Sequence, residues 1–538
     1  MRGTMMTSPL TLFSILERAG RYFPAVEVAS RRPDRSLHRS NWGEVYRRSR
    51  ALAAGLLAAG LRRGDRVATL CWNHSAHVEA YFGVPAAGGV VHTLNLRLSA
   101  DELTLICRHA GDRFLIVDDI LLPVLEKFRE CAPFERVWVV RTCTEPLPPG
   151  WHDFEELLAR GSDGFHYPHV DENDAAAMCY TSGTTGQPKG VAYSHRALVL
   201  HSLAISLADG FGLCQRDSSL VIVPMFHANC WGLPQSAALV GTKMVLPGPY
   251  LDPQSLLELI DGEQCTYAAG VPTIWMGIAE LLEKHPGRWS IPKGFRATSG
   301  GAATPESLLR RCDVLGIELR SSWGMTEMTP AGTTSFLKST LSLPEAERMR
   351  VRSMAGLPFP LVETRVVTPL GEAPWDGKTT GELQVRGPFV AASYYNFPEA
   401  DDRWTEDGWF RTGDVAAIDS EGYVRIADRT KDVIKSGGEW ISSVALENAL
   451  MGHPGVKEAA VIGVPHPKWL ERPLAVIVKA VEGDDDAALR RELTDHLAAR
   501  FAKWQLPDAF VFVEAIPRTS VGKFQKIRLR EQFKDWKW

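Results

Sequence analysis

The sequence predicts an α/β protein with a large N-terminal domain of mixed sheets, a small β-rich subdomain and a small α+β C-terminal domain. Three observations lead to this fold class. The chain has 538 residues, which is more than one hydrophobic core normally serves. Helical and strand patterns alternate through the first two-thirds of the chain, as expected for sheets covered by helices. From residue 363 onward the pattern changes to short strands broken by Gly, Pro and Asp.

The elements of the large domain follow from hydrophobic periodicity. Residues 46–59 form an Ala- and Leu-rich amphipathic pattern, which predicts a helix. The next predictions are a strand at 66–70, a helix at 76–81, and strands at 113–117 and 243–246, followed by a helix at 253–260 and a strand at 266–269. This order favours parallel or mixed sheets.

The β-rich subdomain is predicted from strands at 364–367, 382–385 and 422–426. A polar, Gly-containing stretch at 428–438 follows, and we place the domain boundary there. Beyond it the sequence predicts a helix at 443–451, strands at 458–463 and 474–481, a helix at 487–500 and a basic tail. The prediction is therefore an N-terminal domain at 1–427, a hinge linker at 428–435 and a C-terminal domain at 436–538. The acidic run at 484–486 is interpreted as helix capping rather than as an acidic binding site.

Composition excludes several classes of protein. The 60 Lys and Arg against 64 Asp and Glu give a formal net charge of −4, so no overall basic field attracts nucleic acid. The nine cysteines are scattered singly without a CxxC pair, which is typical of reduced, cytoplasmic thiols and predicts no structural zinc. We expect no signal peptide, because Glu17 and Arg18 directly follow the apolar patch at 9–16 and no small-residue cleavage site appears. We expect no transmembrane segment, because the weakly charged run at 80–96 carries a proline, three glycines and a histidine and falls short of a membrane span.

The strongest local signal is at residues 180–191, Tyr-Thr-Ser-Gly-Thr-Thr-Gly-Gln-Pro-Lys-Gly-Val. Its glycines let backbone N–H groups converge, and its hydroxyls and lysine add further donors to phosphate. It is not a Walker A sequence, because Pro188 precedes Lys189. We interpret it as a polyphosphate-binding loop. A flexible turn between two strands is the alternative.

This loop resembles the signature of the adenylate-forming superfamily, which contains acyl-CoA synthetases, nonribosomal-peptide adenylation domains and beetle luciferases. Further segments resemble the other motifs of that superfamily in the same order: the substrate-side histidine motif at 224–232, the adenine-side loop at 299–303, a motif usually opened by tyrosine at 323–327, the ribose motif at 408–414, the hinge at 428–431 and the catalytic lysine loop at 517–523. The resemblance covers essentially the whole chain. Residues 193–196, 434–443 and 465–469 are most similar to bacterial medium- and long-chain fatty acyl-CoA synthetases and methylmercaptopropionate-CoA ligases.

The resemblance implies a role for each matching residue. It assigns catalysis to Lys523, His227 and Glu327, and magnesium ligation to Thr181 and Glu327. It assigns ATP binding to Thr181, Ser182, Gly183, Thr184, Thr185, Gly186, Lys189, Gly301, Ala302, Trp323, Gly324, Met325, Thr326, Asp414, Arg429, Lys431, Lys435 and Trp440. It assigns acyl binding to His227, Ala228, Trp231 and Gly301, and coenzyme A binding to Gly437 and Gly438.

Each of these roles has a physical reason, and each residue also has a simpler structural interpretation. Glu327 offers oxygen to a hard cation, although a lone glutamate is usually a solvated surface residue. Asp414 has two oxygens that can accept from both ribose hydroxyls, or it closes the Thr-Gly-Asp turn. Trp323 keeps an aromatic face for adenine but lacks the phenolic hydroxyl of the usual tyrosine.

The lysine and the acyl-side residues also have plainer alternatives. Lys523 can neutralise charge that builds on the reacting oxygens, whereas a lysine in a basic tail usually serves solubility. His227 and Trp231 either line the acyl site or fill the core. The basic tail with its interleaved aromatics is interpreted as an amphipathic terminal helix rather than a nucleic-acid-binding segment.

The resemblance implies a two-step ligase. Magnesium-ATP and a medium- or long-chain fatty acid give an acyl-adenylate and pyrophosphate, and coenzyme A then displaces AMP. The C-terminal domain would rotate near Lys431 between the two half-reactions. The alternative substrate is a short thioether or aryl acid.

Other activities remain open from the sequence. A luciferase-like oxygenase and a non-catalytic binding protein are less favoured. A nonribosomal module is not expected, because only fifteen residues follow Lys523 in this sequence. Chain length of the acid, pathway and oligomeric state are left open, and a homodimer is compatible with the resemblance.

Overall fold

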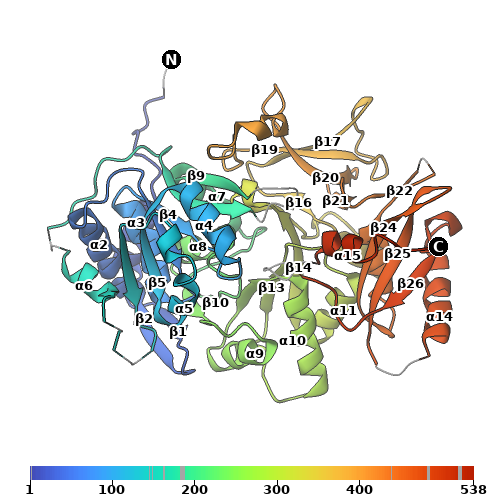
Figure 1. Cartoon of the computed structure of the whole chain (residues 1–538), viewed down its shortest axis with the longest axis horizontal. Helices are drawn as coiled ribbons and strands as arrows, with labels where there is room; N and C mark the ends of the chain where they lie inside the picture. The colour runs from blue at the N-terminus through green and yellow to red at the C-terminus, as the bar shows by residue number, and fades with distance from the viewer. Residues whose placement is uncertain are drawn as a thin grey trace.

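The computed structural model describes residues 1, 3–143, 146–147, 149–161, 164–181, 188–437, 439–481, 485–518 and 524–538. Among these residues the strands form four sheets, two in the large N-terminal part, one in a smaller unit beside it and one in the C-terminal part. Figure 1 shows the C-terminal part, coloured red, at the opposite end of the molecule from the blue N-terminal helices. The predicted α/β class with a small β-rich subdomain and an α+β C-terminal part is confirmed.

The first sheet is mainly parallel and ends in an antiparallel hairpin. Its strands are, in sheet order, β7 (His152–Asp153), β6 (Arg136–Val140), β5 (Asp112–Asp118), β3 (Arg66–Leu70), β4 (Val90–Thr93), β8 (Ala175–Thr181) and β9 (Lys189–Ser194). The helices between them are α2 (Trp42–Ala58), α3 (Ser75–Ala86), α4 (Ala100–Ala110), α5 (Leu122–Leu125) and α6 (Phe154–Ala159). The long helix α2 begins earlier than predicted because the Asn41 side chain accepts the Glu44 N–H and caps it.

The second sheet is parallel in its centre. Its strands are, in sheet order, β16 (Leu357–Pro358), β15 (Ala331–Thr334), β14 (Ile317–Gly324), β13 (Phe295–Ser299), β12 (Tyr267–Gly270), β10 (Ser218–Leu220), β11 (Lys243–Leu246), β1 (Glu27–Arg31) and β2 (Leu37–Asn41). The helices of this region are α1 (Leu12–Tyr22), α7 (His195–Ser206), α8 (Leu233–Val240), α9 (Pro253–Gly262), α10 (Pro272–Lys284), α11 (Glu306–Val314) and α12 (Glu345–Ser353). One large apolar cluster joins residues of both sheets.

The β-rich unit is antiparallel throughout. Its strands are, in sheet order, β18 (Gly371–Glu372), β17 (Glu363–Thr368), β19 (Gly381–Arg386), β20 (Phe410–Ile418) and β21 (Val424–Arg429). The strand predicted at 422–426 is wrong at its start, because Gly422 has a φ of +85° and its N–H bonds the Asp419 carbonyl in a turn. β21 instead extends through Arg429.

The C-terminal sheet contains β23 (Glu439–Ile441), β22 (Ile434–Ser436), β25 (Leu470–Lys479) and β24 (Val456–His466) in that order, and β26 (Ala509–Phe512) also pairs with β25. Its helices are α13 (Ser443–Leu450), α14 (Asp486–Ala498) and α15 (Lys526–Gln532). The Asp485 side chain caps α14 through the Ala487 N–H, which agrees with the capping interpretation of the acidic run. Short 3₁₀ turns are η1 (Asp119–Leu121), η2 (Arg129–Cys131), η3 (Ala228–Gly232), η4 (Thr326–Met328), η5 (Pro398–Arg403) and η6 (Lys503–Gln505).

The link between the last two sheets is short. β21 ends at Arg429 and β22 begins at Ile434, so residues 430–433 connect them. Within the part of the chain that the structure describes, no helix is both long enough and apolar enough to cross a membrane.

Candidate active site

The motif residues gather where parallel strands end. β10, β12, β13 and β14 are consecutive parallel neighbours in the second sheet. The histidine motif follows β10, the adenine-side loop follows β13, and the 323–327 motif overlaps the end of β14. In open α/β sheets, ligands bind outside the carboxyl ends of the strands. The sheet order therefore brings these three motifs to one edge.

The phosphate loop connects the two strands of a hairpin. Thr181 at the end of β8 is paired with Lys189 at the start of β9. Ser182, Gly183, Thr184, Thr185 and Gly186 lie outside the described residues. The Tyr180 phenol is 2.6 Å from His109 Nδ1, and this contact secures the strand that leads into the loop.

Glu327 lies in η4, directly after β14, with 6% of its surface exposed. Its carboxylate Oε1 accepts a hydrogen bond of 2.5 Å from the Tyr394 hydroxyl. Burial and the Glu327 charge raise the pKa of Tyr394, so the phenol stays protonated and donates. Gly324 is required at the end of β14, because a Cβ there would lie 1.9 Å from the Pro330 carbonyl oxygen.

Two further contacts fix this motif. The Tyr193 hydroxyl on β9 donates to the Thr326 carbonyl at 2.7 Å, which joins the hairpin of the phosphate loop to η4. The Lys189 ammonium lies 4.9 Å from the centre of the Tyr394 ring. Lys189 and Glu327 are thus joined through one tyrosine that the sequence analysis did not select. No periodic pattern or motif in a single sequence marks Tyr394.

Trp323, Asp414 and Arg429 meet directly. The Trp323 indole N–H donates to Asp414 Oδ2 at 2.8 Å, and Arg429 Nε lies 3.2 Å from Asp414 Oδ1. The carboxylate is almost fully buried. The indole therefore offers a donor where the resembling proteins usually carry a phenolic hydroxyl. The sequence predicted the aromatic face of Trp323 but not this hydrogen bond.

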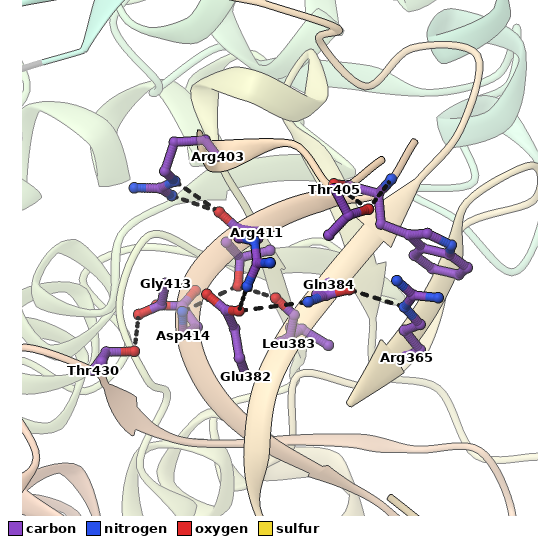
Figure 2. Close-up of polar contacts among 12 residues, drawn as sticks. Arg365, Glu382, Leu383, Gln384, Arg403, Thr405, Arg411, Gly413, Asp414 and Thr430 are labelled. Carbon is purple, nitrogen blue, oxygen red and sulfur yellow. Dashed lines mark hydrogen bonds and ion pairs between the residues drawn. The ribbon is translucent and has the colours of Figure 1, made fainter. Parts of the chain in front are cut away.

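The strand that carries Asp414 is tied to the linker. Figure 2 shows the Thr430 hydroxyl donating to the Gly413 carbonyl, beside Asp414 on β20. The Thr430 N–H donates to the same carbonyl, and both distances are 3.0 Å. Two residues earlier on β20, the Arg411 carbonyl accepts a hydrogen bond from Arg403 (Figure 2). The first linker residue after β21 is therefore held against the ribose motif.

The acyl-side motif forms a left-handed turn. Ala228, Asn229, Cys230 and Trp231 have φ values of 41°, 51°, 55° and 53°. Such backbone costs about 1–2 kcal/mol per residue for non-glycine residues, so the surroundings must hold it. His227 precedes this turn and is half-buried.

Trp231 packs against the adenine-side loop. A Cβ at Gly300 would lie 3.0 Å from Trp231 Cη2, so glycine at 300 makes room for the indole. Gly301 follows with a φ of +83°, and Ala302 is exposed. Trp231 itself is 8% exposed and belongs to the main apolar cluster. The acyl-side and adenine-side motifs therefore touch.

Asn73, which the sequence analysis missed, supports the segment before His227. Its buried side-chain amide donates to the Val221 and Val223 carbonyls at 2.8 and 2.9 Å, and its oxygen accepts the Met225 N–H at 2.8 Å. The Tyr81 hydroxyl donates to the Met225 carbonyl. Asn73 follows β3 of the other sheet, so it connects the two sheets at the site. The role of Asn73 can be recognised only from the packing of the two sheets against each other.

The remaining predicted residues belong to the C-terminal sheet. Lys435 on β22 is paired with Trp440 on β23, and the Trp440 side chain is half exposed. The Gly437 N–H donates to the Trp469 carbonyl at 2.9 Å, and Lys431 is exposed in the linker. Gly438 and Lys523 lie outside the described residues.

The residues that flank the predicted catalytic lysine loop are anchored. Arg518 and Phe524 form a β-bridge, and the Gln525 N–H donates to the Pro517 carbonyl at 2.7 Å. The Lys526 ammonium is 2.6 Å from both Glu447 and the Ser443 hydroxyl. Arg530 of α15 pairs with Asp432 of the linker at 2.7 Å. Helix α15, which follows the loop, therefore also contacts the linker.

Family models match most of the chain. The model described as AMP-binding enzyme matches residues 17–395, and the model described as AMP-binding enzyme C-terminal domain matches residues 445–523. The chain belongs to the AMP-binding enzyme family. The expected superfamily is thereby confirmed.

Curated relatives of this AMP-binding enzyme match along nearly the whole chain. A long-chain-fatty-acid–CoA ligase of Thermus thermophilus is 52% identical over 99% of this chain and 97% of the relative. A medium-chain-fatty-acid–CoA ligase of Ectopseudomonas oleovorans is 42% identical over 99% of this chain and 98% of the relative. A 3-methylmercaptopropionyl-CoA ligase of Ruegeria lacuscaerulensis is 43% identical over 99% of both chains.

The fold of this AMP-binding enzyme is also found among solved structures. The anthranilate CoA ligase AuaEII in complex with anthranoyl-AMP superposes with a TM-score of 0.87, over 99% of both chains at 24% identity. At that identity the similarity shows the fold alone.

Proposed function

We propose that this AMP-binding enzyme is an ATP-dependent acyl-CoA synthetase that acts on a medium- or long-chain fatty acid. The observation that carries the proposal is the contact between the acyl-side and adenine-side motifs, at the same sheet edge as Glu327. An adenylating enzyme needs the acid beside the α-phosphate, and this edge can hold both. The relatives that act on long- and medium-chain fatty acids support the substrate class.

Magnesium binding fits the residues present. Glu327 is buried, and among the described residues Tyr394 is the only side chain that hydrogen-bonds its carboxylate. The second carboxylate oxygen is therefore available to a hard cation, and the neighbouring Thr181 end of β8 adds an oxygen donor. Bound there, Mg²⁺ would neutralise charge on the ATP phosphates.

In the first half-reaction, a carboxylate oxygen of the acid attacks the α-phosphorus of ATP. The bond from that phosphorus to the bridging oxygen breaks, and pyrophosphate leaves. Asp414 would hold the ribose hydroxyls, and Trp323 would offer its face to adenine. We assign Lys523 the stabilisation of charge on the reacting oxygens.

In the second half-reaction, the sulfur of coenzyme A attacks the acyl carbonyl and AMP leaves with the bonding electrons of the acyl–oxygen bond. We propose that rotation at residues 428–435 exchanges the lysine loop for the Gly437–Gly438 segment. The short link between β21 and β22 supports this role, because few bonds need to change. The nine singly scattered cysteines, which include no CxxC pair, support placing the reaction in the cytoplasm.

A short thioether acid is the second candidate substrate. The 3-methylmercaptopropionyl-CoA ligase at 43% identity favours it. A pyrophosphate-release assay over straight-chain acids from butyrate to palmitate, with 3-methylmercaptopropionate and benzoate beside them, separates the candidates. We expect the highest kcat/KM with medium or long chains, and acyl-CoA as the product.

Three results of this assay would contradict the proposal. A preference for the thioether or aryl acid would change the substrate class. Oxygen-dependent light or an oxidised product would indicate a luciferase-like oxygenase. Absence of pyrophosphate release with every acid would indicate a binding protein.

Replacement of Trp231 by alanine tests the acyl channel. We expect the chain-length profile to change while the KM for ATP stays within about twofold, because we assign the indole to the acyl side of the site, away from the phosphate loop. If Trp231 were a plain core residue, its loss would lower the free energy of unfolding by about 3–5 kcal/mol. Chain-length profiles and melting temperatures should be measured on the same preparations.

Trp138 is a suitable control, because it is a fully buried tryptophan on β6, away from the motif-bearing strand ends. Trp138→Ala should lower the melting temperature without changing the profile. If Trp231→Ala behaves in the same way as Trp138→Ala, Trp231 is a core residue and the acyl-channel assignment fails.

A further inference from the structure

Tyr394 occupies an unusual position between two functional groups. It lies in the segment between β19 and β20, outside every motif that the sequence analysis selected. Its hydroxyl donates to Glu327 Oε1 at 2.5 Å, and only 6% of the residue is exposed. Its ring is 4.9 Å from the Lys189 ammonium and 5.2 Å from the Trp404 ring.

The same segment also holds the main chain of Glu327. The Ala391 N–H donates to the Glu327 carbonyl at 2.7 Å, and the Phe389 carbonyl accepts from the Thr329 hydroxyl at 2.7 Å. The β-rich unit therefore hydrogen-bonds both the main-chain carbonyl and the side-chain carboxylate of Glu327 in η4. Trp404 in turn donates to the Ala391 carbonyl at 2.7 Å, which keeps this segment in place.

The charges around Glu327 indicate that the Tyr394 hydroxyl stabilises the buried carboxylate. Across the described ranges, Glu327 forms no ion pair, and the nearby cation of Lys189 faces the Tyr394 ring. The carboxylate is buried, and a buried charge needs strong hydrogen bonds or an opposite charge. Tyr394 supplies one strong hydrogen bond to Oε1 and leaves Oε2 for a cation.

We propose that Tyr394 is a positioning residue that fixes the Glu327 carboxylate for Mg²⁺-ATP and joins it to the phosphate-loop lysine. This inference rests on the proposed adenylation function and on Glu327 as a magnesium ligand. Partners that orient a metal ligand typically affect metal affinity by about 10- to 100-fold. Tyr394 thus makes the β-rich unit part of the nucleotide site.

Tyr394→Phe is the direct test, because it removes the hydroxyl and keeps the ring that contacts Lys189 and Trp404. Isothermal titration calorimetry would give the Kd for ATP with Mg²⁺ and with EDTA. We expect the Kd with Mg²⁺ to rise by about tenfold and the metal-free Kd to stay within about twofold. Thioester formation from supplied acyl-adenylate should be unchanged.

Tyr423→Phe is the matched control. Tyr423 is 1% exposed, and its hydroxyl donates to the Phe336 carbonyl at 3.0 Å and accepts the Lys338 N–H at 3.0 Å. Tyr423→Phe removes a buried hydroxyl whose hydrogen bonds are purely structural. It should lower the melting temperature and leave the ratio of the two ATP Kd values unchanged.

Glu327→Gln separates this inference from the proposed function. If Glu327→Gln leaves the magnesium dependence of ATP binding unchanged, the metal assignment itself is wrong. If Glu327→Gln abolishes that dependence but Tyr394→Phe behaves like Tyr423→Phe, the positioning role alone is overturned. If the metal assignment and the positioning role are both correct, Tyr394→Phe should have little further effect in the Glu327→Gln background. The reason is that the two residues act through one contact.

Discussion

Lys523→Ala should lower the rate of acyl-adenylate formation by about 10²–10³-fold, the usual loss when a group that stabilises transition-state charge is removed. Thioester formation from supplied acyl-adenylate should remain largely intact, because the lysine charge is required only while the carboxylate attacks phosphorus. Rapid-quench measurement of pyrophosphate release and of acyl-CoA formation would report the two half-reactions separately.

The anchored flanks make this substitution specific. The Arg518–Phe524 bridge and the contacts of Lys526 with Glu447 and Ser443 hold both ends of the loop without Lys523. Lys534→Ala, an exposed lysine after α15, is the control for loss of a positive charge in the same tail. An equal loss of both half-reactions in Lys523→Ala would remove the lysine from its assigned role.

Lys431→Pro should have the opposite selectivity. Proline fixes φ near −65° and restricts the preceding residue, so it should hold the linker in one conformer. We expect adenylation to survive and thioester formation to fall by about tenfold or more, which corresponds to a barrier increase of about 1.4 kcal/mol. Single-turnover assays of each half-reaction would check this.

The described backbone indicates that this conformer tolerates proline at position 431. Asp432 and Val433 N–H groups both donate to the Arg429 carbonyl, whereas among the described residues the Lys431 N–H has no carbonyl partner. Proline at 431 therefore removes no backbone hydrogen bond from this conformer. Lys431→Ala controls for loss of the side chain. Unchanged overall turnover in Lys431→Pro would place the hinge elsewhere.

Much of the fold could be predicted from local pattern. The strands at 66–70 and 243–246 coincide with β3 and β11, because each is a short apolar run in a buried parallel sheet. The start of β21 was predicted wrongly, since the turn at Gly422 depends on a hydrogen bond to Asp419. The additional first turn of α2 depends on the Asn41 cap.

Only part of the candidate site could be predicted, because several of its residues are defined by hydrogen bonds that the local pattern does not show. Glu327, Trp323 and Asp414 lie in ordered motifs, and the structure joins Trp323 to Asp414 across 91 residues of sequence. Tyr394 and Asn73 lie outside such motifs. Their hydrogen bonds to Glu327 and Met225 span 67 and 152 residues. Sequence spacing does not report distances of this kind.

The sequence by itself determined the fold class, the order of the motifs and the kind of chemistry that they carry, because periodicity and residue type act over a few residues. Only the tertiary structure decided which of these groups meet: the indole of Trp323 with Asp414, the indole of Trp231 with Gly300, and the phenol of Tyr394 with Glu327. The physical reason is that these contacts depend on how two sheets and a third β-unit pack. Their packing brings strand ends together, and the polar groups left there must satisfy one another.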